Sequence, residues 1–312
     1  MGIGIFTINT IFNRDRKVKL GAIKLKIGAV IVTYNPNIEI FERNVSSVIN
    51  QVNNIVIVDN GSSNFKEIEE SMFAYEKVIL IGLQHNFGIA KAQNDGFYEL
   101  KHRGCKWVLT LDQDTVLPTD YVERITKYIT KYNKKVGIIT GAYIDRNWNT
   151  SYLKEVRQNR DKEVEEFTQE ISSGNLVAMS AWETVGGFDE YLFIDYVDFD
   201  FDYRLKNAGY VLYRANQVEF DHEIGSPIKH NFLTKILLLD RKELFDHSCK
   251  RLFYLNRNRI IVRKRYPQFG SSFKMIIAEI LDLRKVLVMK GSKIKKFSNS
   301  LLGIVSGILY KD

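Results

Sequence analysis

The most informative stretch of this chain reads Trp107-Val108-Leu109-Thr110-Leu111-Asp112-Gln113-Asp114. Strand-forming residues lead directly into two carboxylates spaced one residue apart, and a turn through Pro118 follows. In α/β proteins, ligands bind where such strands end. Carboxylates are hard oxygen ligands that suit Mg²⁺ or Mn²⁺, and these ions bind diphosphates. Because solvated aspartates also follow many ordinary strands, the rest of the chain has to decide whether this pattern marks a site.

An alternation of strand and helix patterns precedes this stretch. The spacing of apolar residues predicts a helix from Ile38 to Gln51, and a second helix spans about 88–103, where Gly104 fits as the C-terminal cap. Three further apolar runs predict buried strands: 27–32, 55–58 and 78–81. This order predicts an α/β fold with a mainly parallel central sheet, flanking helices and right-handed crossovers.

Polar residues end three of the predicted strands: Thr33-Tyr34-Asn35, Asp59-Asn60-Gly61 and Asp112-Gln113-Asp114. The carboxyl ends of parallel strands share one edge of the sheet, so we expect these residues to meet. Asp59 either accepts a hydrogen bond from the imide N–H of a pyrimidine or serves only as an Asx-turn residue. The chain has neither a G-x-G-x-x-G motif nor a Walker lysine loop, which argues against dinucleotide oxidoreductases and P-loop kinases. A metal held by Asp112 and Asp114 is then expected to balance the charge of a diphosphate.

The second half of the chain carries another acidic centre, formed by Asp195, Asp198, Asp200 and Asp202. We expect a helix that begins near Val197 and ends near Gly209. Asp198 would lie in its first turn and is the best candidate for a general base acting on a hydroxyl. Acid enrichment at a helix N-terminus explains one or two of these carboxylates without any function, but not all four.

The segments around this helix are less regular. Residues 154–170 are charged and are expected to be a loop or a helix, and a short strand is expected at 176–179. His222 follows a strand-like segment at 218–220. A lone histidine is more often structural than functional, but beside a metal it becomes a candidate third ligand.

Composition and charge describe a folded protein with a basic tail. Hydrophobic residues make up 45% and aromatic residues 12% of the 312 residues. Cys105 and Cys249 lack C-x-x-C spacing, so disulfide frameworks and zinc sites are not expected and a reducing compartment is favoured. The +8 net charge is uneven, because residues 229–312 hold 19 Lys+Arg and 6 Asp+Glu, a net of +13, against −5 for the preceding 228 residues.

Three regions follow from these patterns: an N-terminal extension of unassigned role (1–26), a catalytic domain (27–228) and a helical, basic C-terminal region (229–312). No apolar run approaches the ~20 residues that span a bilayer. Residues 1–12 lack the basic start and the cleavage site of a signal peptide, so none is expected. We expect a cytoplasmic protein that is peripheral on the inner face of the cell membrane.

The basic tail has several interpretations. Lys293, Lys295 and Lys296 precede the apolar runs 301–305 and 308–310, which favours binding to an anionic membrane surface. The same residues are also explained by a helix that packs on the catalytic domain and turns its charged face to water, or by a contact in a homo-oligomer. A nucleic-acid-binding protein without catalysis is the alternative from a different class, but it would need a recognised module and more aromatic residues among the cations. We therefore expect no nucleic-acid partner.

An ordered series of motifs over roughly residues 27–265 resembles the inverting glycosyltransferases of family 2, which have a GT-A fold, and most of all their bacterial rhamnosyltransferase branch. The series consists of 30–35 (VIVTYN), 58–62 (VDNGS), 86–90 (NFGIA), 111–114 (LDQD), 186–190 (GGFDE), 195–198 (DYVD) with Arg204, 222–225 (HEIG) and 254–258 (YLNRN).

This resemblance implies roles for individual residues. Thr33, Tyr34 and Asp59 would contact the nucleotide base, and Asn86 and Lys91 would lie near the sugar-nucleotide. Asn35 and Gln113 complete the expected nucleotide-sugar site. Asp112 and Asp114 would form the metal-binding D-x-D motif for Mg²⁺ or Mn²⁺, with His222 as the third ligand. The catalytic aspartate of the family falls on Asp198, but Val197 replaces the usual preceding glutamate, so Asp195 and Asp200 stay as alternative bases.

The resemblance also implies a reaction. The donor would be dTDP-β-L-rhamnose, and the acceptor a cell-surface glycan that is often carried on a polyprenyl diphosphate lipid. The sugar would move in a single displacement with inversion and an oxocarbenium-like transition state. UDP-galactofuranose, UDP-glucose or UDP-N-acetylglucosamine are alternative donors on the same fold. A helix N-terminus would lower the pKa of Asp198 and the neighbouring carboxylates would raise it, and the sequence leaves that balance open.

Overall fold

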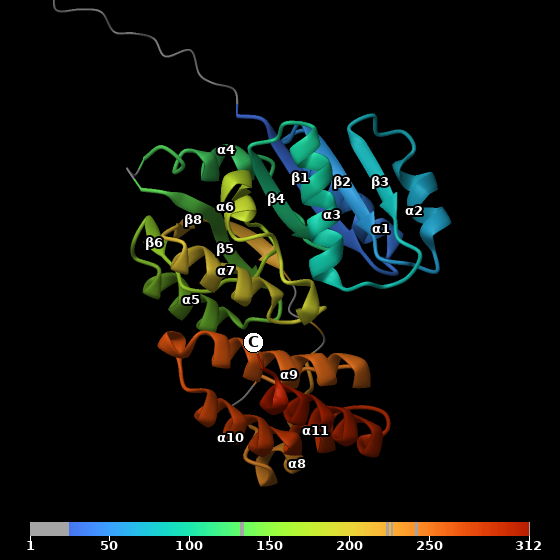
Figure 1. The fold of residues 1–312 in the computed structure, drawn as a ribbon, viewed down its shortest axis with the longest axis vertical. Helices are drawn as coiled ribbons and strands as arrows, with labels where there is room; N and C mark the ends of the chain where they lie inside the picture. Colours follow the sequence, from blue (N-terminus) through green and yellow to red (C-terminus); the bar gives the residue numbers. More distant parts are fainter. Residues whose placement is uncertain (1–24, 132–133, 223–224, 226, 241–242, 312) are drawn as a thin grey trace, which may run out of the picture.

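The computed structural model describes residues 25–131, 134–222, 225, 227–240 and 243–311. Residues 1–24 of the expected N-terminal extension therefore lie outside the described residues. The described chain forms an eight-stranded sheet in the order β3-β2-β1-β4-β7-β5-β8-β6, with helices on its faces (Figure 1). The α/β fold expected from the strand–helix alternation is confirmed.

The N-terminal half follows the sequence patterns closely. The strands are β1 (Ile27–Thr33), β2 (Asn54–Asp59), β3 (Val78–Gly82) and β4 (Trp107–Asp112), and they pair in parallel. The helices between them are α1 (Ile38–Val48), α2 (Phe65–Met72) and α3 (Ile89–His102). The residues of β1 and β2 are almost all buried, because helices or loops cover both faces of a parallel sheet.

Two glycines let α3 lie close against β1. A Cβ atom at Gly96 would come within 2.6 Å of a methyl carbon of Val30, and one at Gly28 within 2.5 Å of Leu100. Gly104 ends the helix segment as expected, with φ of 76° in the left-handed region that suits glycine. The amide of Cys105 returns to the carbonyl of Leu100 at 3.0 Å, which satisfies one of the last helical acceptors.

The second half of the sheet is mixed in direction. Its strands are β5 (Val136–Asp145), β6 (Val164–Glu166), β7 (Leu176–Ala178) and β8 (Val211–His222). The β7 strand runs antiparallel to both neighbours, and β6 runs antiparallel to β8. The connecting elements are α4 (Tyr121–Thr126), α5 (Thr150–Asn159), α6 (Met179–Thr184), η1 (Glu190–Leu192) and α7 (Val197–Asn207).

Two of these strands were not predicted. The expectation of loop or helix for 154–170 holds for α5 but is wrong for β6, which is too short to show an alternating pattern. The β5 strand is interrupted by Gly137 and Gly141, and its register with β8 shifts at both positions. At Gly141 a Cβ atom would lie 2.3 Å from the carbonyl oxygen of Val218, so only glycine fits this close backbone approach.

The C-terminal region is helical, as expected. Its elements are α8 (Phe232–Ile236), α9 (Cys249–Arg265), η2 (Pro267–Phe269), α10 (Ser272–Asp282), η3 (Leu283–Val288) and α11 (Lys293–Leu309). These elements gather on one side of the sheet-bearing part of the molecule (Figure 1). Ile261, Val262 and Tyr266 of this region belong to the same buried core as the sheet. No helix among the described residues is both long and apolar enough to cross a membrane.

Candidate active site

The three polar strand ends meet at one edge of the sheet. Thr33 and Asp59 are register partners, and the Thr33 hydroxyl donates to Asp59 Oδ1 at 2.9 Å. On the other side of β1, Val32 pairs with Asp112. The amide of Tyr34 donates to Gln113 Oε1 at 2.8 Å, which ties the first strand exit to the third. The structure therefore assembles the edge that the strand pattern predicts.

Asp59 acts in this structure as the anchor of its own turn. Its Oδ2 accepts from the amides of Gly61 at 3.1 Å and Ser62 at 2.8 Å, while its Oδ1 accepts from Thr33. The residue is only 1% exposed. Asn35 joins the same loop, because its Oδ1 accepts from the amide of Ser63 at 2.8 Å. The Asx-turn role of Asp59 is thus present, and a role with a nucleotide base stays a prediction.

Asn86 lies at the same edge as the Asp59 turn. The amide of Phe87 donates to Asn60 Oδ1 at 2.9 Å, and Asn86 Oδ1 accepts from the amide of Gly88 at 2.9 Å. These bonds shape the loop that leads into α3. Lys91, in the first turn of α3, forms an ion pair with Asp95 one turn further on.

Asp112 is held at the end of β4 by bonds to its backbone. Its amide donates to the Ser173 hydroxyl at 3.0 Å, and its carbonyl accepts from the side chain of Asn44 at 2.9 Å. Burial raises the pKa of the Asp112 carboxyl, and the neighbouring Asp114 raises it further, whereas His222 lowers it. Asp112 and His222, 110 positions apart in sequence, therefore lie within electrostatic reach of each other.

His222 is a buried residue at the end of β8. Its Nδ1 lies 3.2 Å from the hydroxyl oxygen of Thr115, which in turn lies 2.8 Å from that of Ser173. Because Ser173 also accepts from the Asp112 amide, His222 and Asp112 share one hydrogen-bonded cluster. Two carboxylates and an imidazole form a donor set that fits Mg²⁺ or Mn²⁺ chemically. However, no group of three His, Cys, Asp or Glu side chains is close enough to hold a metal ion anywhere in the described part of the chain.

Asp198 belongs to the second acidic centre and lies in the first turn of α7. Burial raises the pKa of its carboxyl from 3.8 to about 7, and the charges of Asp195 and Asp112 push it in the same direction. The amide of Phe199, which donates to Asp198 Oδ1 at 2.9 Å, opposes this rise. The effect of burial exceeds that of the backbone amide at the helix N-terminus. The pKa of Asp198 is therefore raised, which resolves the balance that the sequence left open. A carboxyl with this pKa is suited to proton transfer near neutral pH.

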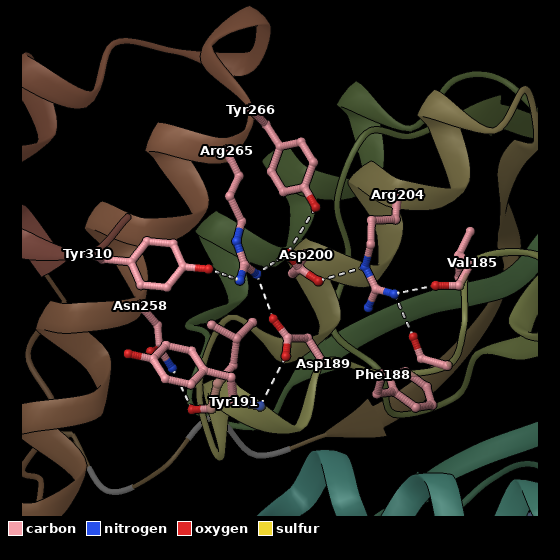
Figure 2. Close-up of polar contacts among 12 residues, drawn as sticks. Val185, Phe188, Asp189, Tyr191, Asp200, Arg204, Asn258, Arg265, Tyr266 and Tyr310 are labelled. Atoms are coloured by element: carbon pink, nitrogen blue, oxygen red, sulfur yellow. Dashed lines mark hydrogen bonds and ion pairs between the residues drawn. The ribbon is translucent and has the colours of Figure 1, made fainter. Parts of the chain in front are cut away.

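Asp200, one of the alternative bases, lies inside a buried network. Arg204 Nε donates to its Oδ2 at 2.8 Å, as the i,i+4 spacing permits. Arg265 Nη1 and the Tyr266 hydroxyl donate to its Oδ1 at 3.1 and 2.9 Å (Figure 2). With 0% exposure and both oxygens occupied, this carboxylate joins α7 to α9 and is not open to an acceptor hydroxyl.

Asp195, the other alternative, is paired with a cation from the C-terminal region. Arg251 of α9 donates to Asp195 Oδ1 from Nη2 at 2.9 Å and to its Oδ2 from Nε at 3.1 Å. Arg251 is also one of the charges that lower the pKa of Asp112. An arginine thus stands between the two acidic centres, and no sequence pattern assigned it there.

The loop that presents Asp198 has a strained backbone. Phe193, Asp195 and Tyr196 have φ values of 65°, 63° and 66°, in the left-handed region that non-glycine residues rarely adopt. Such residues cost ~1–3 kcal/mol each and persist only where their surroundings hold them in place. Asn258 of α9 provides that restraint by donating to the carbonyls of Leu192, Ile194 and Asp195 at 2.7, 2.9 and 2.9 Å.

A cavity of about 220 Å³ lies beside this loop, between α9, α10 and η3. Tyr196 lines one part of it, and Leu283, Val286 and Met289 line another. Arg259 reaches into the same region, where its Nε donates to the Tyr196 hydroxyl at 2.8 Å. A cavity with both apolar and charged walls therefore begins two residues from Asp198.

Comparison with known proteins identifies the kind of site this is. The family model of glycosyl transferase family 2 matches residues 29–187, which span β1 to the turn after α6 and include the whole D-x-D edge. The chain belongs to glycosyl transferase family 2. It is thus a glycosyltransferase, and the non-catalytic nucleic-acid-binding alternative is wrong.

Similar proteins agree with this membership. The dTDP-rhamnosyl transferase RfbF of Shigella flexneri is 28% identical over 293 residues, which cover 90% of this chain and 95% of that protein. The crystal structure of S. aureus TarS 1–349 has a TM-score of 0.51 at 12% identity and covers 90% of both chains. The structure of GalNAc-T7 with UDP, GalNAc and Mn²⁺ has a TM-score of 0.53 at 16% identity, over 83% of this chain and 57% of that one. The solved structures show the fold alone, which is that of GT-A glycosyltransferases.

Proposed function

We propose that this glycosyltransferase moves L-rhamnose from dTDP-β-L-rhamnose to a hydroxyl of a cell-surface polysaccharide or lipid-linked glycan, with inversion at the anomeric carbon. The similarity to a dTDP-rhamnosyl transferase over nearly the full length supports the donor. The observation that carries the mechanism is Asp198, a partly buried carboxyl whose pKa is raised to about 7 and which lies within electrostatic reach of Asp112 at the sheet edge.

In this mechanism Asp198 accepts the proton of the acceptor hydroxyl as that oxygen attacks the anomeric carbon. The bond between this carbon and the diphosphate oxygen breaks in the same step, and the proton stays on Asp198 until product release. A base whose pKa lies near the working pH combines a useful ionised fraction with enough basicity. Val197 replaces the glutamate of the family motif, so Asp198 supplies this function without a carboxylate directly before it.

We propose that Asp112, Asp114 and His222, which are not gathered closely enough to hold an ion in the described structure, would come together around Mg²⁺ or Mn²⁺ when the ion binds. The metal would supply positive charge to the departing diphosphate. The shared cluster of Asp112, Ser173, Thr115 and His222 supports this assignment, as does the charge of Asp114, which raises the pKa of Asp112.

The nucleotide-sugar is assigned to the other strand exits. Thr33, Tyr34, Asn35, Asp59, Asn86, Lys91 and Gln113 are proposed to line its site. The bonds from Tyr34 to Gln113 and from Phe87 to Asn60 support a common edge for these residues. Asp59 is proposed to act through the Thr33 hydroxyl and the turn that it anchors.

We propose that residues 27–228 form the catalytic domain and residues 229–312 a helical layer that shares its core. The acceptor would approach from the side of this layer, where the cavity beside Tyr196, lined by both apolar and charged side chains, offers room for part of a lipid-linked acceptor. Such an acceptor requires a cytoplasmic enzyme that works at the inner face of the cell membrane.

A donor panel tests the proposal. The purified protein is incubated with dTDP-rhamnose, UDP-glucose, UDP-galactofuranose and UDP-N-acetylglucosamine, each with and without Mg²⁺ or Mn²⁺, and the released nucleotide diphosphate is measured. We expect turnover of dTDP-rhamnose to exceed that of the UDP-sugars by at least about tenfold. Faster turnover of any UDP-sugar would contradict the assignment of rhamnose as the donor sugar, but it would still agree with glycosyltransferase activity.

A further inference from the structure

Two C-terminal helices expose the side chains that a helix normally buries. Along α11 the exposed residues include Ile294, Phe297, Leu301, Leu302, Val305 and Ile308. Along α10 they are Phe273, Ile277, Ile280 and Leu281. Both sets recur every three or four positions, so each forms one continuous stripe on the outer face of its helix.

The fully buried residues of the same helices are small or polar, apart from Ile304. On α11 the buried residues are Lys296, Ser300, Gly303, Ile304 and Gly307, and on α10 the only buried residue is Glu279. A Cβ atom at Gly303 would lie 2.4 Å from the carbonyl oxygen of Phe253, so α11 packs on the backbone of α9 through glycine. Apolar residues outward and small or polar residues inward reverse the usual pattern of a water-facing helix.

The charges around these stripes are almost all positive. From 272 to 311 the only acidic residues are Glu279 and Asp282. Glu279 is buried against Arg259 at 2.6 Å, and Asp282 pairs with Lys285 at 2.6 Å. Exposed cations lie near both stripes: Lys274, Lys290, Lys293 and Lys295. An apolar stripe bordered by lysines complements an anionic lipid surface, whereas a second copy of the chain would bring like charges together.

We propose that the outer faces of α10 and α11, together with the exposed Phe232 and Ile236 of α8, form a lipid-docking surface for anionic bilayers. The α8, α10 and α11 helices lie on the side of α9 that faces away from the sheet (Figure 1). Two layers of helices, α10 with α11 and then α9, which carries Arg251 and Asn258, separate this surface from the candidate site, a distance of ~20 Å. The inference rests on the proposed function only in that the docked enzyme would meet a membrane-borne acceptor.

Vesicle flotation with the full chain tests this surface. Wild-type protein is mixed with vesicles of phosphatidylcholine, with and without phosphatidylglycerol. We expect flotation only with the anionic vesicles and a loss of binding as salt rises. Phe273→Glu and Leu302→Glu should each weaken binding at least about tenfold, because each puts a carboxylate into the docked face.

Matched controls come from α2 and its C-terminal end. Phe73 is an apolar side chain that is 92% exposed but lies outside the C-terminal region, so Phe73→Glu should float like wild type. Lys293→Glu should weaken binding, whereas Lys66→Glu, whose lysine is 86% exposed on α2, should not. Thermal melts by circular dichroism confirm that each variant is folded.

Several results would overturn the proposal. One is the absence of flotation of wild-type protein with anionic vesicles. Another is equal binding of Leu302→Glu, Phe273→Glu and wild type. A third is light scattering that shows a wild-type dimer converted by Leu302→Glu to a monomer, without vesicle binding, since the face would then cover a second copy. Donor hydrolysis in vesicle-free solution is expected to be equal in Leu302→Glu and wild type. Flotation without turnover of any nucleotide sugar would contradict the proposed function alone.

Discussion

The side-chain amide of Asn258 donates a hydrogen bond to the main-chain carbonyl of Asp195 at 2.9 Å, although Asn258 lies on α9 and Asp195 on the loop before α7. The same amide reaches the carbonyls of Leu192 and Ile194. A single buried side chain therefore holds the strained loop that positions Asp198. The C-terminal helices are in this respect part of the proposed catalytic apparatus.

We expect Asn258→Leu to lower kcat about 10²-fold with little change in the KM for the donor, because the loop can shift by about 1 Å without these bonds. The acid limb of the pH–rate profile should also move to lower pH. Burial is the largest cause of the raised pKa of Asp198, and a loosened loop admits water to this carboxyl. The measurement is kcat and kcat/KM from pH 5 to 9.

Asn256→Leu is the matched control. Asn256 is also buried on α9, but the hydrogen bond that its side chain donates among the described residues goes to the carbonyl of Leu252 within the same helix. This variant should lose stability, by ~1–3 kcal/mol, without moving the acid limb. If both variants keep the wild-type profile, Asn258 has a purely structural role.

Asp198→Asn should reduce the rate of transfer by ~10²–10⁴-fold while leaving the affinity for the donor nearly unchanged. The base must be ionised to accept a proton, so in wild type kcat/KM should fall as the pH drops below about 7. Transfer to an acceptor, with donor affinity measured by titration calorimetry, checks both parts. A variant that transfers at the wild-type rate would remove Asp198 from the mechanism.

The same carboxyl should affect stability. Its pKa is raised in the folded state, so between about pH 4 and pH 7 the folded state binds more protons than the unfolded state. The free energy of unfolding should therefore decrease as pH rises through this window. Asp198→Asn removes that penalty and should be more stable than wild type at pH 8, by up to about 4 kcal/mol. Urea unfolding at pH 4 and pH 8 measures the difference, which should be much smaller at pH 4.

Asp200→Asn should act on stability and not on the acid limb. It removes the charge that pairs with Arg204 and Arg265 inside the protein, and an unpaired buried partner costs ~3–5 kcal/mol. Denaturant unfolding and the pH–rate profile of the same preparation separate the two effects. A shift of the acid limb without a loss of stability would favour Asp200 over Asp198 as the base.

Removal of divalent metal should suppress transfer, and Mg²⁺ or Mn²⁺ should restore it. Asp112→Asn and His222→Gln should raise the dissociation constant for Mn²⁺ by ~10–100-fold, which electron paramagnetic resonance of free Mn²⁺ measures independently of turnover. Asp120→Asn is the control. Asp120 is an exposed aspartate that follows the same strand, and it pairs with Arg124 outside the proposed metal site. Unchanged Mn²⁺ binding in Asp112→Asn would contradict the metal assignment.

The sequence by itself determined the parallel half of the sheet and the edge where its strands end. Strand runs such as 27–32 and 107–111 are long, apolar and separated by helical spacing, so local hydrophobic pattern is enough to specify them. The motif series also determined the family, and the helix carrying Asp198 began where its apolar spacing indicated. The short β6 and the glycine-interrupted β5 were missed because neither carries a clear period.

Only the tertiary structure decided what each acidic residue does. Asp195, Asp198 and Asp200 look alike in the sequence, but packing desolvates Asp198 and raises its pKa, pairs Asp195 with Arg251 and encloses Asp200 between Arg204 and Arg265. Arg251 and Arg265, like Asn258, come from an element far along the chain, and no local pattern encodes such contacts. The same holds for the outward apolar faces of α10 and α11, because a helical period shows that a stripe exists but not which side the rest of the protein covers.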